Sequence, residues 1–596
     1  MPTYKAPTRD QKFLLHEVLD LSRFSELDGF KDADPEMIDA ILEESAKFAE
    51  DVLTPLNRVG DEHGCIRNED GTVTVPPGFH EAFDQMRANG WMGLAADPQY
   101  GGQGLPRVLG MACGEMTSSA NMAFTMYPGL TGGASKAISI GGSEQQKDFY
   151  LPKMYAGEWT GTMNLTESHC GTDLGLLKTK ATAQADGNYK ITGQKIFISA
   201  GEHGMSENII HLVLARIEGG PEGVKGISLF IVPRNSVDKN GNVGENNGVS
   251  CGSIEEKMGI HGNSTCVMNF DNAVGELIGE PHKGLKVMFV MMNEARMGVG
   301  LQGLCQSEAS YQNAAIYAND RIQGRSLTGA KNKKGSADPI IVHPDIRRMI
   351  MDSRAFNEGA RAFLYWLALQ EDLKNVSPDE KVRERADDYL GLMTPVIKGY
   401  LTDIGFANCV NAQQVYGGHG YIEEWGMSQF VRDARIAQIY EGANGIQALD
   451  LVGRKLARKG GRALMSISAE IDAYVKEHEG NADLKPFMNG LSNAKNKLQT
   501  GTMWLMQNGM SNPDNAGAGS VDYMHMMGIA MLTYMWARMA KIAQAAIDAG
   551  SDDPFYADKL ITGKYFLARI LPNMDAHLVK VQSGAEPVMA LAADRF

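Results

Sequence analysis

Cysteine is scarce in this chain. Only seven of the 596 residues are cysteine, and no two of them form a C-x-x-C pair. This pattern excludes a disulfide scaffold and a thiolate zinc site, and it favours a reducing compartment. The 13 histidines form no cluster with metal-ligand spacing either.

Long hydrophobic runs and excess positive charge are also missing. The longest apolar runs, such as residues 287–292, are far shorter than the roughly 18 residues of a membrane-spanning helix. No apolar segment precedes the first acidic residue, so we expect no signal peptide. The net charge of −15 makes the chain a poor candidate for binding nucleic acid or anionic lipid. We therefore expect a soluble, cytoplasmic, multidomain enzyme.

Common catalytic signatures are absent too. The sequence contains no G-x-x-x-x-G-K-[ST] or H-E-x-x-H pattern, which removes the commonest phosphate-loop and zinc-peptidase functions. One G-x-G-x-x-G pattern does occur, at residues 298–303, with Asp320 at the spacing of a ribose-binding acid. Its surroundings are helical rather than βαβ, so we interpret these glycines as a tight helix–helix contact.

Residue periodicity predicts four structural regions. Asp34 and Pro35 have the pattern of an N-cap followed by proline at the first helical position, and helical patterns continue to about residue 160. From residue 161 the pattern becomes β-like, with Asp186-Gly187 as a hairpin turn, and helical periodicity returns near Leu285. Because the strands lie close together along the chain, we expect antiparallel pairing.

We therefore predict an α+β multidomain fold. It comprises a helical domain, an antiparallel β-domain, a four-helix bundle and an additional C-terminal helical domain. Residues 325–344 are expected to form an exposed loop, and residues 458–462 a hinge. The predicted boundaries are an N-terminal extension at 1–37, then domains at 38–160, 161–280, 281–457 and 458–596.

The apolar helix predicted at residues 526–547 has two interpretations. Its methionine-rich stripe suits packing against the bundle or a second subunit, which we favour. The alternative is a helix that lies on a membrane surface.

Two segments of the β-region have the composition of a ligand site. Residues 163–173 read MNLTESHCGTD, in which Thr166 and Thr172 are hydroxyl donors in a backbone-rich loop. Residues 195–201 read KIFISAG, in which Phe197 alternates with two isoleucines and Ser199 supplies a hydroxyl. A polar turn and a half-buried strand are the structural alternatives. The functional interpretation is an aromatic wall and hydroxyl donors around a flat cofactor.

Two further loops lie in the second helical region. Residues 414–420 read QVYGGHG, and Glu441 lies between Tyr440 and Gly442 in a later loop. A lone glutamate in a loop is usually solvated. One that is flanked by an aromatic residue and by glycines can instead face a closely packed ligand.

Together these segments resemble the acyl-CoA dehydrogenase family. The resemblance covers roughly residues 38–455, and it depends on several segments that occur in the family's order. They are MNLTESHCGTDLGLLKTKA, GQKIFISAG, KMGIHGNST, QVYGGHGYIEEWGMSQFVRDARI and IYEGANGIQ. The whole chain is most similar to the 3-methylmercaptopropionyl-CoA dehydrogenases of dimethylsulfoniopropionate breakdown, among the longer members of the family. This resemblance implies oxidation of 3-methylthiopropanoyl-CoA to methylthioacryloyl-CoA.

The resemblance implies non-covalently bound FAD and a catalytic carboxylate at Glu441. Glu441 would remove the α-proton, the flavin would accept the β-hydride, and Gly442 would let the thioester approach the backbone. Arg296 matches an arginine near the CoA pantetheine, and Thr172 matches a position near the substrate or pyrophosphate. The matched FAD-binding positions are Thr166, Thr172, Phe197, Ser199, Arg321, Gln414 and Gly418.

The sequence departs from the family pattern at several positions. Ser168 replaces the usual proline, and the R-x-x-F-G pattern that begins at Arg321 has lost its phenylalanine. In some branches the base lies on a bundle helix. That position is Ala295 here, and neighbouring Glu294 is turned by about 100° around the helix, so Glu441 remains favoured.

The resemblance also implies partners. Electron-transfer flavoprotein would take up the electrons, as in the dehydrogenases, and the extra C-terminal domain implies a homodimer. The alternatives are a short- or medium-chain fatty acyl-CoA dehydrogenase of β-oxidation, an acyl-CoA oxidase that uses O2, and a flavin-bearing nucleic-acid-binding protein like the alkylation-response members of the fold.

Overall fold

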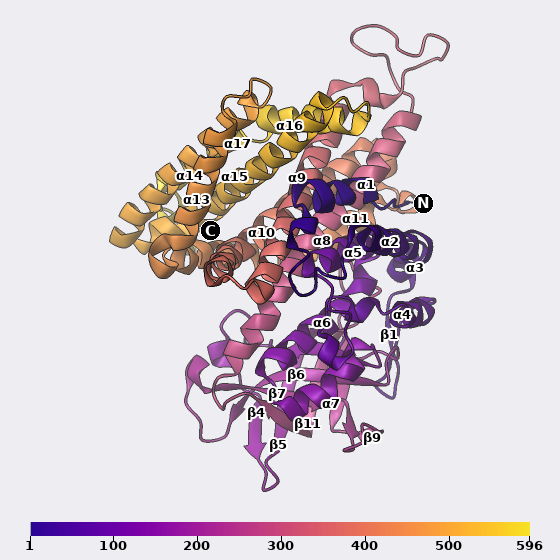
Figure 1. Cartoon of the computed structure of the whole chain (residues 1–596). Helices are drawn as coiled ribbons and strands as arrows, with labels where there is room; N and C mark the ends of the chain where they lie inside the picture. Colours follow the sequence, from indigo (N-terminus) through magenta and orange to yellow (C-terminus); the bar gives the residue numbers. More distant parts are fainter. Residues whose placement is uncertain (1) are drawn as a thin grey trace. The chain divides into compact units, whose positions relative to one another are not determined.

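Helices form both ends of the chain and strands form its middle in the computed structural model, which describes residues 2–596 (Figure 1). The predicted order of helical, β, helical and helical regions is confirmed. The chain divides into two compact units, which are described separately. One contains Lys47–Leu105 and Ala120–Gly298, and the other contains the residues up to Ala46, Pro106–Ser119 and Val299–Phe596.

Helix α2 (Pro35–Lys47) begins as predicted. Asp34 Oδ1 accepts a hydrogen bond from the Met37 backbone N–H at 2.8 Å, and Pro35 is the first helical residue. The next helices precede the seven-stranded sheet in sequence. They are α3 (Thr54–His63), α4 (Phe79–Ala88), α5 (Arg107–Ala120), α6 (Met122–Gly141) and α7 (Glu144–Tyr155).

The middle region is a seven-stranded sheet of mixed direction. Strands β4 and β5 form the predicted hairpin around Asp186-Gly187, but β3 and β4 both run parallel to β6. The expectation of purely antiparallel pairing was therefore wrong, because the chain between β3 and β6 is long enough for a crossover. The strands are β3 (Trp159–Asn164), β4 (Lys180–Ala183), β5 (Tyr189–Ser199), β6 (Asn208–Ile217), β7 (Ile227–Pro233), β10 (Val249–Ile254) and β11 (Thr265–Ile278).

Both faces of the central strands are buried. On β6, Leu212 and Val213 belong to different apolar clusters, and on β7 Phe230 and Ile231 do the same. Because successive side chains of a strand point to opposite faces, each strand contributes to two cores. This explains why β6 and β7 read as continuous apolar runs rather than as alternating patterns. The short strands β1 (Ile66–Arg67), β2 (Val73–Thr74), β8 (Asn235–Val237) and β9 (Val243–Asn246) form two small hairpins.

The G-x-G-x-x-G pattern lies inside the long helix α8 (Gly284–Asp320), not in a βαβ unit. A Cβ at Gly300 would lie 2.3 Å from the Ile397 side chain, and one at Gly303 would lie 2.6 Å from the Leu401 carbonyl oxygen. These glycines therefore permit a close approach to helix α10, as predicted. The bundle helices are α8, α9 (Pro344–Val376) and α10 (Glu380–Val415), followed by α11 (Met427–Ile436) and α12 (Asn444–Asp450).

Both predicted breaks in the helices occur. The connection between α8 and α9 is mostly exposed and projects at the top of Figure 1. Its buried anchor is Asp338, whose carboxylate accepts the backbone N–H groups of Ser326 and Asn332 at 2.8 and 2.6 Å. Left-handed backbone at Lys459 and Gly460 separates the bundle from the helices that follow.

The predicted apolar segment at residues 526–547 lies in helix α15 (Pro513–Asp548) and is mostly buried, so the interpretation as a membrane-surface helix was wrong. It packs against α9, α10 and α14, and Met527, Met531 and Met535 are all buried. None of the helices in residues 2–596 combines the length and apolar character needed to cross a bilayer. The extra helices are α13 (Arg462–His478), α14 (Lys485–Ser511), α15 (Pro513–Asp548), α16 (Pro554–Arg569), α17 (Asn573–Ser583) and α18 (Glu586–Met589).

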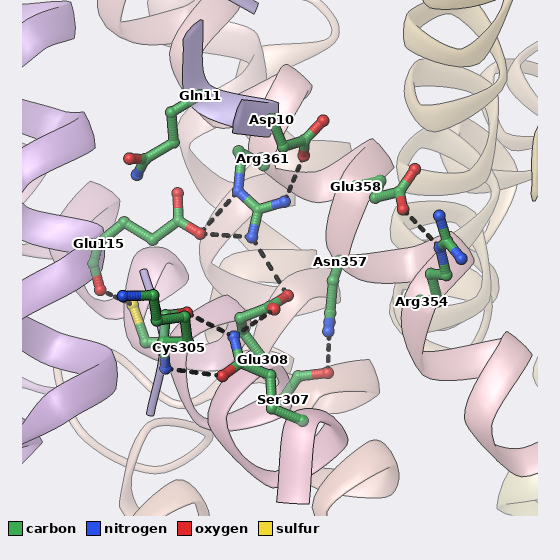
Figure 2. Close-up of polar contacts among 12 residues, drawn as sticks. Asp10, Gln11, Glu115, Cys305, Ser307, Glu308, Arg354, Asn357, Glu358 and Arg361 are labelled. Atoms are coloured by element: carbon green, nitrogen blue, oxygen red, sulfur yellow. Dashed lines mark hydrogen bonds and ion pairs between the residues drawn. The ribbon is translucent and has the colours of Figure 1, made fainter. Parts of the chain in front are cut away.

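The N-terminal segment joins the bundle to these extra helices through buried charges. The Arg361 guanidinium contacts Asp10, Glu115 and Glu308 at 2.5, 2.7 and 3.1 Å (Figure 2). Lys559 on α16 also contacts Asp10, and it contacts Glu358 at 2.8 Å. The sequence did not predict this cluster, because it joins segments as far apart as residues 10 and 559 in the chain.

Candidate functional site

The predicted hydroxyl loop and the predicted aromatic strand lie side by side. Thr166 follows the end of β3, and its carbonyl oxygen accepts a hydrogen bond from the Ile196 backbone N–H at 2.9 Å. Ile196 lies on β5, directly before Phe197. The structure therefore brings Thr166, Phe197 and Ser199 together, as the functional interpretation requires. Thr172 lies farther along the same loop and is exposed.

Phe197 lies in a β-bulge rather than in a regular strand. Ile198 is paired with Cys266 and Lys195 with Met268, so Ile196 and Phe197 together oppose a single residue of β11. The expected alternation of Phe197 with its neighbours is therefore interrupted. Phe197 has a positive φ of 59°, and 59% of the side chain is exposed. Such strain and exposure of an aromatic ring are typical of a ligand-contacting position.

The hydroxyl groups beside this ring are available to a ligand. Within residues 2–596, the side chains of Thr166 and Ser199 make no hydrogen bond. An exposed aromatic face with hydroxyl donors beside it fits a flat heterocycle that carries several hydrogen-bond acceptors. This donor set fits the isoalloxazine ring of FAD.

A buried ion pair, which the sequence did not predict, holds this loop on the strand. Lys195 is buried, and its ammonium group donates to the Leu165 carbonyl at 3.0 Å and to Glu167 Oε1 at 2.8 Å. Burial would raise the pKa of Glu167, but Lys195 and the donors on Thr179 and Lys178 lower it to about 2. Burial lowers the pKa of Lys195 to about 8, against the attraction of Glu167. The only sequence signal was a lysine within an otherwise apolar strand.

Glu441 lies in the bend between α11 and α12, with an unusual backbone. Its φ is +56°, and that of Gly442 is +86°. The Gln447 side-chain amide donates to the carbonyl oxygens of both residues, at 3.2 and 3.1 Å. The adjacent Tyr440 hydroxyl donates to Gln302 at 2.5 Å. A glutamate held in left-handed backbone by its neighbours is strained, and such strain concentrates at functional sites.

Arg321, Gln414 and Gly418 lie near one end of α8 and α10. Arg321 follows α8, and Tyr317 in its last turn stacks on Tyr416 at a ring distance of 4.0 Å. Tyr317 also has its hydroxyl 2.8 Å from His419 Nδ1. All three predicted residues are exposed, and a Cβ at Gly418 would meet nothing within 4 Å. The open surface agrees with contact to a ligand or a second chain.

Arg296, a predicted substrate contact, and Glu294, the neighbour of the alternative base position, lie on α8. This part of α8 belongs to the unit that contains the sheet. Arg296 is buried there, and Glu294 is half-buried. Glu441 and Gly442 belong to the other unit. None of the described residues forms a group of three or more His, Cys, Asp or Glu that could hold a metal ion.

The chain matches four domain families in succession. Residues 35–158, 162–273 and 282–456 match the acyl-CoA dehydrogenase N-terminal, middle and C-terminal domains. Residues 467–592 match a domain described as acetyl-CoA dehydrogenase C-terminal like. A 3-methylmercaptopropionyl-CoA dehydrogenase from Ruegeria pomeroyi is 39% identical, over 98% of this chain and 99% of that protein. The chain belongs to the acyl-CoA dehydrogenase family.

Two further comparisons agree with this membership. A broad-specificity linear acyl-CoA dehydrogenase, FadE5, from Mycobacterium tuberculosis is 33% identical over the full length of both chains. The structure of an acyl-CoA dehydrogenase complexed with FAD from Bacillus anthracis has the same fold. Its TM-score is 0.75 at 22% identity, and the match covers 92% of this chain and 88% of that chain. The protein is thus an FAD-dependent acyl-CoA dehydrogenase, which acts on the CH–CH bond of an acyl-CoA thioester.

Proposed function

We propose that Glu441 is the base that removes the α-proton of the acyl-CoA thioester. The observation that carries this role is the left-handed backbone of Glu441 and Gly442, whose carbonyl oxygens accept hydrogen bonds from the Gln447 side chain. In this conformation the carboxylate stands beside a glycine, which leaves room for the thioester close to the main chain. The family resemblance points to the same residue.

The reaction needs a base and a hydride acceptor. When bound, FAD supplies the acceptor, because no side chain can accept a hydride. We propose that Thr166, Phe197, Ser199 and Thr172 hold the flavin in one unit. Arg321, Gln414 and Gly418 would contact the pyrophosphate or adenosine of the FAD bound by a neighbouring subunit.

The remaining chemistry belongs to the chain. The α-proton becomes removable when the thioester oxygen accepts hydrogen bonds that strengthen as enolate charge develops. The backbone N–H of Glu441 is the donor that we propose, and Gly442 permits the close approach. Exclusion of water by the substrate strengthens the carboxylate as a base. Arg296 and Thr172 are the proposed contacts to the CoA portion of the substrate.

We propose 3-methylthiopropanoyl-CoA as the substrate and methylthioacryloyl-CoA as the product. The support is the 39% identity to the Ruegeria pomeroyi enzyme over nearly the whole chain. The second candidate is a short- or medium-chain fatty acyl-CoA, which is favoured by the full-length similarity to the broad-specificity linear acyl-CoA dehydrogenase. We also propose electron-transfer flavoprotein as the acceptor, a homodimeric assembly and a cytoplasmic location.

The base is tested with the Glu441→Gln variant. We expect it to retain FAD but to lose most turnover, because the amide cannot accept the α-proton. The flavin spectrum and anaerobic bleaching by substrate measure the two properties separately. Activity close to that of the unaltered enzyme would remove Glu441 from this role.

Substrate and acceptor are tested together. A dye-coupled assay compares 3-methylthiopropanoyl-CoA, butanoyl-CoA and octanoyl-CoA, and the highest kcat/KM identifies the substrate class. Rapid reoxidation of the reduced enzyme in air would favour an oxidase and contradict the proposed acceptor.

A further inference from the structure

Contacts join the extra C-terminal helices to both ends of the Glu441 loop, defined here as residues 437–443. Asp403 on α10 is at the centre. Its Oδ1 accepts hydrogen bonds from the side-chain amides of Gln438 and Asn444, both at 2.7 Å. Its Oδ2 lies 2.9 Å from Nε2 of His525, which belongs to α15. One carboxylate therefore connects α15 to a residue near the start of the loop and to the residue just after it.

Asn444 fixes the end of the loop with nearly all its polar atoms. Its side-chain oxygen accepts from the buried Lys398 ammonium at 2.8 Å, and its amide nitrogen also lies 2.9 Å from Thr402 Oγ1. Its backbone N–H donates to the Gln438 carbonyl at 3.1 Å, which closes the loop on itself. Glu441 lies between these two anchors. A glutamate in left-handed backbone is strained, so it persists only where surrounding contacts determine it.

Close packing of α15 on α10 brings His525 to Asp403. A Cβ at Gly528 would lie 2.3 Å from the Tyr400 ring, and one at Gly399 would lie 2.3 Å from Met524. His525 packs edge-on against Tyr400 at a ring distance of 5.3 Å. The two glycines therefore bring the helices close enough for the histidine to reach the carboxylate.

Asp403 is suited to a permanent anchoring role. Burial would raise the pKa of its carboxyl group, but the hydrogen bonds from His525 and Gln438 lower it below its ordinary value. The group therefore stays a carboxylate and can accept all three donors at neutral pH. Charge-assisted hydrogen bonds of this kind are stronger than neutral ones and fix geometry.

We propose that the extra C-terminal domain positions the catalytic loop, with His525 acting through Asp403. This inference rests on the proposed role of Glu441. Neither residue is proposed to touch substrate, so both are positioning residues. A base must be held within roughly 0.5 Å of its productive position, and a displacement of about 1 Å can cost on the order of 100-fold in rate.

The test compares two histidines that lie next to each other on the same domain. His577 lies 5.2 Å from His525 between ring centres, but its Nδ1 contacts Asp522 at 2.7 Å rather than Asp403. His525→Phe removes the contact to Asp403, and His577→Phe is the matched control. We expect His525→Phe to lower kcat at least tenfold, with FAD content and KM nearly unchanged. We expect His577→Phe to retain kcat within a factor of two.

Backbone hydrogen exchange supplies a second measurement, independent of turnover. In His525→Phe, amides of residues 437–447 should exchange faster than in the unaltered enzyme, whereas those of α13 should not change. His525→Gln retains an N–H donor that can reach Asp403, and it should recover part of the lost kcat. Asp403→Asn is of similar size and should show the same defects if His525→Phe fails to fold.

The outcomes separate this inference from the proposed role of Glu441. If Glu441→Gln is inactive while His525→Phe and Asp403→Asn keep full kcat and normal exchange in the loop, the positioning role is refuted and the base remains. If both histidine variants lose kcat equally, the effect belongs to general domain stability, and the inference also fails. An active Glu441→Gln variant overturns both proposals.

Discussion

The buried charges around Arg361 predict a large and pH-dependent loss of stability in Arg361→Met. This guanidinium contacts three carboxylates, those of Asp10, Glu115 and Glu308, and it is almost fully buried with them. Methionine fills a similar volume but leaves the acids without their shared cation. Removing one partner from a buried ion network typically costs about 3–5 kcal/mol.

The pH dependence follows from the sign of the pKa shifts. In the unaltered protein, burial raises the pKa of Asp10, but Lys559 and Arg361 together lower it by more than burial raises it. The net shift is therefore downward. Without Arg361, burial is opposed less at Asp10 and Glu308, and the folded-state pKa of these two carboxyls rises. A carboxyl whose pKa is raised in the folded state destabilises the fold at pH values above its unfolded-state pKa. This penalty shrinks as the pH falls. The difference between variant and parent should therefore be larger at pH 8 than at pH 5.

Thermal unfolding by calorimetry measures the effect. At pH 8 we expect the melting temperature of Arg361→Met to fall by at least about 5 °C. Arg354→Met is the matched control, because Arg354 lies seven residues earlier on α9 but is partly exposed and pairs mainly with Glu358 at 2.8 Å. Its loss should be about 1 kcal/mol or less. A melting temperature within 1 °C of the parent for Arg361→Met would refute the reasoning.

Two further predictions concern Lys195 and the glycines of α8. Lys195→Met should weaken FAD retention, because the loop that contains Thr166 loses its contact to Lys195. Lys190→Met, at an exposed position of the same strand, should not weaken it. Fluorescence of the flavin released during gel filtration distinguishes the two variants. Gly303→Ala should lower the free energy of unfolding by about 1–3 kcal/mol, because its Cβ would lie 2.6 Å from a carbonyl oxygen of α10. Gly298→Ala has open space and should be neutral or stabilising by up to about 1 kcal/mol, as denaturation midpoints would show. Equal losses in both glycine variants would contradict the packing argument.

Local patterns predicted local features well. The cap at Asp34, the turn at Asp186-Gly187 and the helical setting of residues 298–303 each depend on neighbours within a few positions. The structure confirms all three. Residue periodicity also predicted the order of the helical and β regions, which the structure confirms.

Long-range features were not predictable in the same way. The direction of β3 against β6 depends on a crossover, and the bulge at Phe197 depends on how β11 pairs with β5. Lys195 begins a segment whose structural alternative was a half-buried strand, and nothing in that pattern indicated that its charge is buried against Glu167. The contact between His525 and Asp403 joins positions 122 residues apart. No local pattern records such a partner.

The union of Asp10 with Lys559 has a consequence for biosynthesis. The two residues are 549 positions apart, so the ribosome makes Asp10 long before it makes Lys559. At a synthesis rate of roughly 5–20 residues per second, Lys559 is made about half a minute to two minutes after Asp10. During that interval Asp10 cannot form its ion pair with Lys559. The buried contact between Asp10 and Lys559 therefore forms only after helix α16 has been synthesised.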